Sequence, residues 1–242
     1  MKTRNILMCN TMLAALALSG CGASVPVKVG QQSLSGIRTV AIVKVPEPRE
    51  YTVIDKGSPA GAMGAVGGAA IAMEANKNQK GLLGALARTK FSFADELTAE
   101  LQATLRKLGY QTKVVSAQRS DPHKLLGEYS ALTTSNDDAV LDVSTKGAGY
   151  ATQHWLTSPF WRPEAHVEVA LYSRNAGELV YDESFMYGYH NPFISATNLD
   201  APVAYQFANK AAMEATSDER LISGLKDAAK AIANAVAAKF AK

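Results

Sequence analysis

The sequence predicts an α/β fold of the α+β type, in which a mixed sheet of about five strands is packed by two or three amphipathic helices. Short segments rich in β-branched or alternating apolar residues predict five strands, at 37–45, 110–116, 139–150, 165–173 and 178–187. Leucine and alanine stripes at helical spacing predict the helices. The last three strands follow one another without a helix, which predicts a β-meander.

The first strand is predicted to lie in the middle of the sheet. Residues 37–45 are largely apolar on both faces and end before Pro46 and Pro48. Strands that read as continuous apolar runs are typical of positions buried on both sides.

A helix is predicted to begin after Ser92 and to end at Gly109. Ser92 suits the N-cap, with Asp95 three residues later, and glycine is the usual residue just past a helix end. The apolar stripe of this helix consists of Phe93, Leu97, Leu101, Leu105 and Leu108. The alternating residues 110–116 then predict the second strand.

Two further helices are predicted. Asp121 suits an N-cap and Pro122 the first helical position, which predicts a short helix. Its apolar side chains are Leu125, Leu126, Tyr129 and Leu132. The carboxyl-terminal helix has the stripe Leu221, Leu225, Ala228, Ile232, Val236 and Phe240.

A hairpin is predicted around the turn Asn175-Ala176-Gly177. In its first strand, Val167, Val169 and Leu171 are expected to face the core, and His166, Glu168 and Tyr172 to face outward. In its second strand, the residues expected to share one face are Leu179, Tyr181, Phe185 and Tyr187.

The amino terminus has the form of an export signal. Basic residues Lys2 and Arg4 precede an apolar stretch at 6–18 that is too short to span a bilayer. The end of this stretch, Leu18-Ser19-Gly20-Cys21, resembles the lipobox of bacterial lipoproteins. We expect cleavage before Cys21 and covalent attachment of diacylglycerol and an N-acyl chain such as palmitate to that residue.

The segmentation expected from this signal is a leader at 1–20, a lipidated tether at 21–36, and a single periplasmic domain at 37–242. Gly22 is compatible with export to the outer membrane, where we expect the anchored chain, because aspartate at this place favours inner-membrane retention in bacterial lipoproteins. The 25 basic and 22 acidic residues give a net charge of +3, and removal of the leader's two basic residues leaves +1. No basic stripe stands out, so nucleic acid is not expected as a partner.

The mature chain resembles a family of periplasmic lipoproteins that includes the curli-secretion channel subunit and the lipoprotein activators of penicillin-binding proteins. The segments that carry the resemblance are IRTVAIVKV, LGYQTKVV, DAVLDVSTKGAGY and VEVALYSRNAGELVYDESF, followed by the terminal helix. The resemblance covers roughly residues 37–242 and implies a non-enzymatic role in the cell envelope. It transfers no functional residue, because no motif specific to one member is present.

Catalytic and metal-binding motifs are not found in the sequence. The four histidines, His123, His154, His166 and His190, show no helical i, i+4 pair, and His166 is expected to be a solvated surface residue. No nucleophile elbow or phosphate-binding loop occurs. The adjacent carboxylates Asp137-Asp138 and Asp182-Glu183 are expected to point apart on strands. We therefore expect no cofactor and no enzyme activity, with an envelope hydrolase as a minor alternative.

An aromatic segment between two predicted strands is a candidate contact surface for a partner or a membrane. Its contact residues are Trp155, Leu156, Phe160 and Trp161. Tryptophan and phenylalanine offer large apolar area, and a hairpin tip is otherwise expected to be polar. The alternative is that the segment folds back and caps the core of the sheet.

A glycine- and alanine-rich insertion at 57–80 is the second candidate contact surface. Gly57 with Gly61, and Gly64 with Gly68, have the GxxxG spacing that allows close helix packing. Three interpretations stay open: a flexible insertion, a helix packed on the domain or a neighbour, and a membrane-touching element of an oligomer.

Two main hypotheses for function follow from these features. In the first, a lipid-tethered domain binds or regulates an envelope assembly through an exposed surface. In the second, the chain is a homo-oligomeric secretion or pore component of the outer membrane.

Overall fold

The structure is a computed structural model that describes residues 34–56, 80–129, 132, 137–153, 158–188 and 194–241. Its strands are β1 (Thr39–Val43), β2 (Tyr51–Asp55), β3 (Gln111–Val115), β4 (Ala139–Gln153), β5 (Ser158–Ser173), β6 (Glu178–Tyr187) and β7 (Thr197–Leu199). Its helices are α4 (Lys80–Thr89), α5 (Phe93–Lys107), α6 (Lys210–Glu214) and α7 (Asp218–Lys239), with a 3-10 turn, η2 (Val203–Tyr205). The mixed α/β fold class predicted from the sequence is confirmed.

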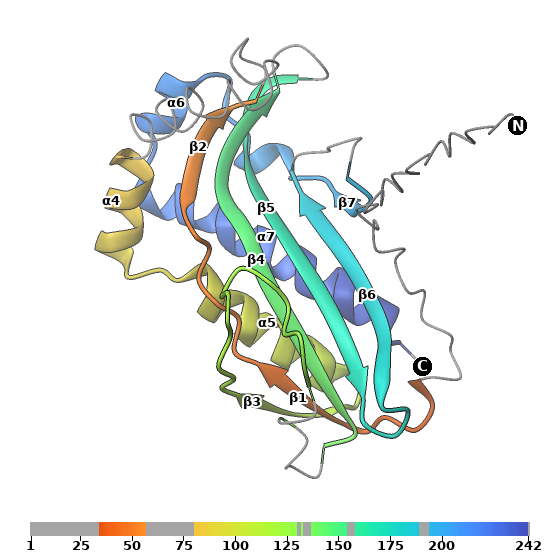
Figure 1. Cartoon of the computed structure of the whole chain (residues 1–242). Helices are drawn as coiled ribbons and strands as arrows, with labels where there is room; N and C mark the ends of the chain where they lie inside the picture. The colour runs from red at the N-terminus through yellow and green to blue at the C-terminus, as the bar shows by residue number, and fades with distance from the viewer. Residues whose placement is uncertain are drawn as a thin grey trace, which may run out of the picture.

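Among the described residues, seven strands form one mixed sheet, six of them in the order β3-β1-β4-β5-β6-β7 and the seventh, β2, beside β4 (Figure 1). Strand β1 is parallel to both β3 and β4, and the long strands β4, β5 and β6 form the predicted antiparallel meander. The central position predicted for the first strand is confirmed. Strand β2 pairs in parallel with the far half of β4, beyond the part that β1 occupies.

The pairing of β2 with β4 depends on Gly149. This residue has a φ of +156°, and a Cβ placed on it would lie 1.9 Å from the Thr52 carbonyl oxygen. Only glycine therefore lets the two backbones approach this closely.

Helices α5 and α7 pack on one face of the sheet, behind it in the view of Figure 1. The Ser92 and Ser217 side chains accept hydrogen bonds from the third residue beyond each, so both helices begin at the expected kind of N-cap. The stripes of α5 and α7 are buried against the strands, and Leu34, at the end of the predicted tether, belongs to the same core. The exception in these stripes is Leu108, which caps α5 and is exposed.

A second, smaller apolar cluster lies on the opposite face of the sheet. It is built from Ala41, Val43, Val140 and Tyr129, and the segment 116–129 provides the cover over it. In Figure 1 this segment crosses in front of the part of the sheet near β1 and β3.

The short helix predicted after Asp121 is wrong, because the described residues between 121 and 132 form turns and irregular backbone. The Asp121 side chain accepts a hydrogen bond from the His123 backbone N–H at 2.9 Å, which closes a local turn. Farther along, the Leu126 N–H donates to Asp142 Oδ2 at 2.7 Å. The second bond satisfies a backbone N–H that a helix would have paired with the Pro122 carbonyl.

The structure differs from the sequence prediction in two further respects. Strands β2 and β7 and helices α4 and α6 have no counterpart in the sequence prediction. A register shift opposite Leu171 and Tyr172 turns Val180 toward the core and leaves Leu179 exposed, so Leu179 does not share the face of Tyr181, Phe185 and Tyr187. No helix of the described residues has the length and apolar character that a membrane crossing requires.

Candidate functional site

One face of the sheet is only partly covered by described residues. Side chains alternate along β5, and Pro163 faces α7, where a Cβ on Gly224 would meet its Cγ at 3.2 Å. The residues at even positions therefore point to the opposite side, away from the helices. We call Phe160, Arg162, Glu164, His166 and Glu168 the helix-free strip.

The two ends of the helix-free strip differ in exposure. Phe160, near the start of β5, is 42% exposed, whereas Glu164 is buried and His166 and Glu168 are partly buried. Beyond Glu168, the same face carries Ala170 and Tyr172, and Tyr172 stacks on Tyr129 of the covering segment. The strip is thus the part of this face that the covering segment leaves open.

A cavity of about 280 Å³ lies at the middle of the helix-free strip. Charged and polar side chains from three separate parts of the chain line it together with two apolar ones: Lys56, Lys146, Glu164, His166, Met186 and Ile194. Lys56 forms an ion pair with Glu164, and Lys146 Nζ lies 2.7 Å from Glu168 Oε2. His166 therefore lies between two glutamates of β5, and each glutamate is paired with a lysine from another part of the chain.

A β-bulge shapes this cavity. The register between β4 and β5 passes from Thr145 opposite Val167 to Gly147 opposite His166, so Lys146 is the extra residue. Its Nζ also donates to the His123 carbonyl oxygen at 2.8 Å. A Cβ on Gly147 would meet no described atom within 4 Å, so the described residues leave space beside the imidazole.

The surroundings of His166 favour its neutral form. Burial lowers the pKa of His166 below its ordinary value, Lys146 and Lys56 lower it further, and Glu168 and Glu164 act in the opposite direction. Its Nε2 is buried and has no hydrogen-bond partner among the described residues. Buried polar atoms are seldom left unpaired, so such an atom in a cavity calls for an explanation.

The covering segment is held down by Asp142. This carboxylate accepts hydrogen bonds from Arg119, from the Leu126 N–H and from the Tyr129 hydroxyl. Ser144 Oγ donates to the His123 carbonyl oxygen at 3.1 Å and holds the segment at a second point. The boundary of the open part of the face is therefore fixed by polar contacts.

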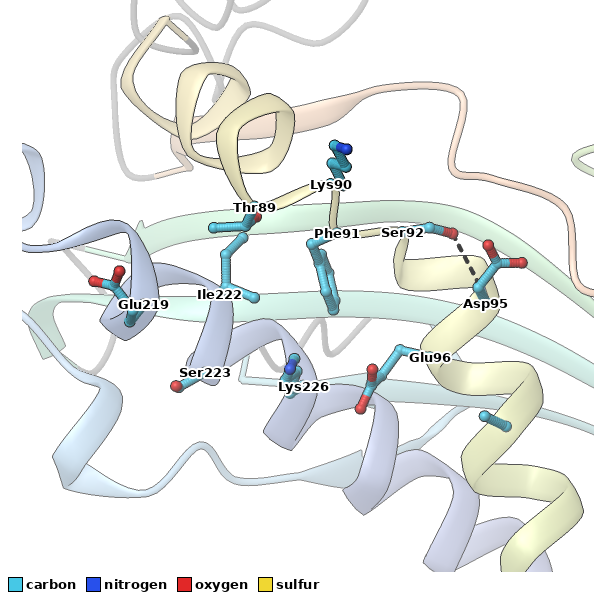
Figure 2. A pocket seen from close by; sticks show the side chains of 11 residues that line it. Thr89, Lys90, Phe91, Ser92, Asp95, Glu96, Glu219, Ile222, Ser223 and Lys226 are labelled. Atoms are coloured by element: carbon cyan, nitrogen blue, oxygen red, sulfur yellow. Dashed lines mark hydrogen bonds between the residues drawn. The ribbon is translucent and has the colours of Figure 1, made fainter.

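A second hollow, of about 480 Å³, lies on the helix side between the starts of α5 and α7. Figure 2 shows the Lys90 side chain pointing away from it and the Phe91 ring pointing between the two helices. Ser92 caps α5 here by accepting from the Asp95 N–H at 2.9 Å. Among the described residues, the buried side-chain atoms without a partner are His123 Nδ1, Thr145 Oγ1 and His166 Nε2, and none of them lines this hollow.

Of the predicted contact residues, the structure describes Phe160 and Trp161. Phe160 is exposed, but Trp161 is only 4% exposed, and its backbone exchanges two 2.8 Å hydrogen bonds with Phe207. Trp161 is not an exposed contact residue, because β5 begins at Ser158 and alternation turns Trp161 toward the core. For this residue the structure agrees with the alternative, in which the aromatic segment covers the core of the sheet. Trp155 and Leu156 lie outside the described residues.

The other predicted site residues also lie outside the described residues. They are the signal and lipidation residues Leu18, Ser19, Gly20 and Cys21, and the glycines Gly57, Gly61, Gly64 and Gly68. The lipid anchor and the glycine-mediated packing stay predictions.

His166 is the residue whose importance the sequence analysis missed. Its outward direction is confirmed, but the expected solvated position is wrong, since the ring is mostly buried beside the cavity. The sequence signal that marks it is the alternation Glu164, His166, Glu168 on one strand face. Asp137 and Asp138 precede β4 and contact different partners: Asp137 pairs with Lys113, and Asp138 accepts from the Arg38 and Thr39 N–H groups.

Within the described residues, no group of three or more His, Cys, Asp or Glu side chains could hold a metal ion. No family model matches the sequence, and no curated protein matches it. Among solved structures, this chain is similar to one chain of the dodecamer of a PelC variant from Paraburkholderia phytofirmans. That likeness has 8% identity and a TM-score of 0.33, over 90% of this chain and 96% of the other. It is a weak likeness of architecture, and the finer resemblance to periplasmic lipoproteins stays a prediction.

Proposed function

We propose that this chain is a lipid-anchored protein of the bacterial cell envelope that binds an envelope protein partner through the helix-free strip. The residues Leu18-Ser19-Gly20-Cys21, after a basic and then an apolar stretch, support the anchor. One acyl chain binds a membrane only marginally, whereas two or more anchor a protein stably. Diacylglycerol with an N-acyl chain on Cys21 meets that requirement.

The observation that carries the binding role is the helix-free strip itself. Helices cover one face of the sheet, and the segment 116–129, which is hydrogen-bonded to Asp142, covers part of the other. The remaining strip combines an exposed aromatic residue, Phe160, with charged side chains around a cavity. Aromatic residues and arginine are enriched at protein interfaces, and the strip presents Phe160 and Arg162 on one face.

Binding, rather than catalysis, is the role that we assign to the strip. Its carboxylates Glu164 and Glu168 are each engaged in an ion pair with a lysine. The sequence has no nucleophile elbow or phosphate loop that would place a reacting group nearby.

The anchor is tested by the mass of the full chain purified from its native membranes. A product that begins at Cys21 and carries the mass of a diacylglycerol and an acyl chain supports the proposal. The variant Cys21→Ala should lose both the added mass and the membrane association. An unmodified thiol at this position, or a different first residue, would contradict the anchor.

The binding role is tested by cross-linking the anchored chain to envelope proteins. Phe160→Ser should abolish a cross-link that the unchanged chain forms. Leu83→Ser is the matched control, because Leu83 is 44% exposed and lies on α4, in the helix layer. Equal cross-linking by both variants would remove the strip as the interface. A large ring-shaped assembly of many copies of this chain in detergent would favour the pore alternative instead.

A further inference from the structure

We propose that the cavity around His166 binds a small oxyanion, a carboxylate or phosphate group, and that binding is coupled to protonation of the imidazole. The inference rests on the helix-free strip being a binding face, and it gives the chemical class of one ligand of that face. The cavity volume of about 280 Å³ is near the lower end for ligand sites, so the ligand is small.

Positively charged donors from two different elements meet at this cavity. Lys56 follows β2, and Lys146 projects from the bulge in β4. An ammonium group has three donors, and the contacts of Lys146 with Glu168 and with the His123 carbonyl use two of them. Ammonium and imidazole groups that converge on one space are the usual partners of carboxylate and phosphate oxygens.

The unpaired Nε2 of His166 is an independent observation that points to a ligand. In the structure the atom is shielded from the cavity, so the ring must turn toward the cavity for a ligand oxygen to accept its hydrogen bond once the ring carries a proton there. The open space beside Gly147 is where such an oxygen fits, since Gly147 lies opposite His166 and a Cβ on it would meet no described atom within 4 Å.

The charge balance of the cavity explains the coupling to protons. The pairs Lys56–Glu164 and Lys146–Glu168 each cancel, and the β6 residue opposite His166 is the uncharged Met186. Two lysines and two glutamates are the described charged groups that act on His166, so protonation of the imidazole adds a positive charge that these pairs do not compensate. An anion binds that form more tightly, and by linkage it must raise the pKa of the imidazole.

A matched control is present in the same chain. His123 also has a buried, unpaired ring nitrogen, Nδ1, but its side chain does not line the cavity. A general effect of salt on histidines would move the titrations of both residues, whereas a bound oxyanion would move that of His166.

The experiment follows the imidazole signals of the purified full chain by nuclear magnetic resonance as the pH is lowered. The probes are inorganic phosphate and sodium acetate, each compared with sodium chloride at equal ionic strength. We expect a probe to raise the titration midpoint of His166 by about one pH unit, which corresponds to about tenfold tighter binding to the protonated form. The midpoint of His123 should stay in place.

The assignment of the His166 signal is fixed by His166→Gln, which should remove the responding resonance. His123→Gln should leave the response intact. A response to phosphate alone identifies a phosphate ligand, a response to acetate alone a carboxylate, and a response to both a general oxyanion site. Identical midpoints in all three salts, or equal shifts of both histidines, would overturn the proposal.

The two proposals fail separately. The cross-linking test uses Phe160→Ser, which leaves the cavity residues unchanged, and the salt titration needs no protein partner. If Phe160→Ser abolishes the cross-link but no salt shifts the His166 titration, the helix-free strip is supported as a binding face and the oxyanion ligand is rejected.

Discussion

Arg119 and Asp142 form an ion pair that is almost completely withdrawn from solvent, with side-chain exposures of 6% and 0%. The two residues are 23 positions apart, and the pair joins the covering segment to the first part of β4. Asp142 accepts two further hydrogen bonds, from Leu126 and Tyr129 of the same segment. The pair therefore fixes a part of the chain that has little regular secondary structure.

Asp142→Asn should destabilise the protein by about 3–5 kcal/mol, because Arg119 would be left as an uncompensated buried charge. Urea unfolding measures the loss. The control is Glu214→Gln, which breaks the exposed pair Lys210–Glu214 on α6 and should cost less than about 0.5 kcal/mol. Similar effects of both substitutions would show that the buried pair contributes no more than a surface pair.

Two helical glycines should respond in opposite directions to alanine. Gly224→Ala places a Cβ 2.4 Å from the Tyr150 hydroxyl and 3.2 Å from Pro163, so we expect a loss of about 1–3 kcal/mol. In Gly81→Ala, the new Cβ meets no described atom within 4 Å, so the higher helix propensity of alanine should raise the free energy of unfolding by up to about 1 kcal/mol. Thermal unfolding of the two variants checks both signs, and a neutral Gly224→Ala would mean that α7 can shift away from the sheet.

Neighbouring aromatic residues of β5 should differ in their contribution to stability. Trp161→Ala removes a core side chain and should cost about 3–5 kcal/mol. Phe160→Ala acts on an exposed side chain and should cost less than about 1 kcal/mol. The free energy of unfolding in urea measures both, and the reverse order would contradict the alternation of β5.

Acidification should weaken the fold through His166. Burial lowers the pKa of the folded histidine below the ordinary value of 6.5, so the unfolded chain takes up the proton first. This contribution to stability is complete above pH 6.5 and is lost as the pH falls through the folded pKa. The slope is at most about 1.4 kcal/mol per pH unit for one proton. Unfolding at several pH values should show a shallower dependence for His166→Gln, and equal slopes in both proteins would contradict the burial effect.

Local patterns predicted much of the fold. The stripe of α5 with its Ser92 cap, the stripe of α7, and the alternation of Val167, Val169 and Leu171 all appear in the structure as expected. These features depend on residues a few positions apart, because helical and strand periodicity are properties of neighbouring side chains. The same reasoning failed at Asp121 and Pro122, where a valid local helix signal is overridden by a distant partner, Asp142.

The candidate site could be predicted only in part, for the same reason. The sequence indicated that His166 and Glu168 share a strand face, but not that Lys56 reaches Glu164 across 108 positions. It also could not show that a bulge at Lys146 opens space beside the imidazole, since bulges depend on how two strands are paired.

Contiguous residues were enough to predict the fold class, the apolar faces of the long elements and a lipid anchor at Cys21, because each of these is encoded by a local pattern. The folded chain was needed to show that Trp161 is a core residue, that the segment 116–129 covers part of a sheet face, and that the Nε2 atom of the partly buried His166 has no partner among the described residues. Those outcomes depend on contacts between residues far apart in the chain, where burial and charge are set by whatever the fold brings together.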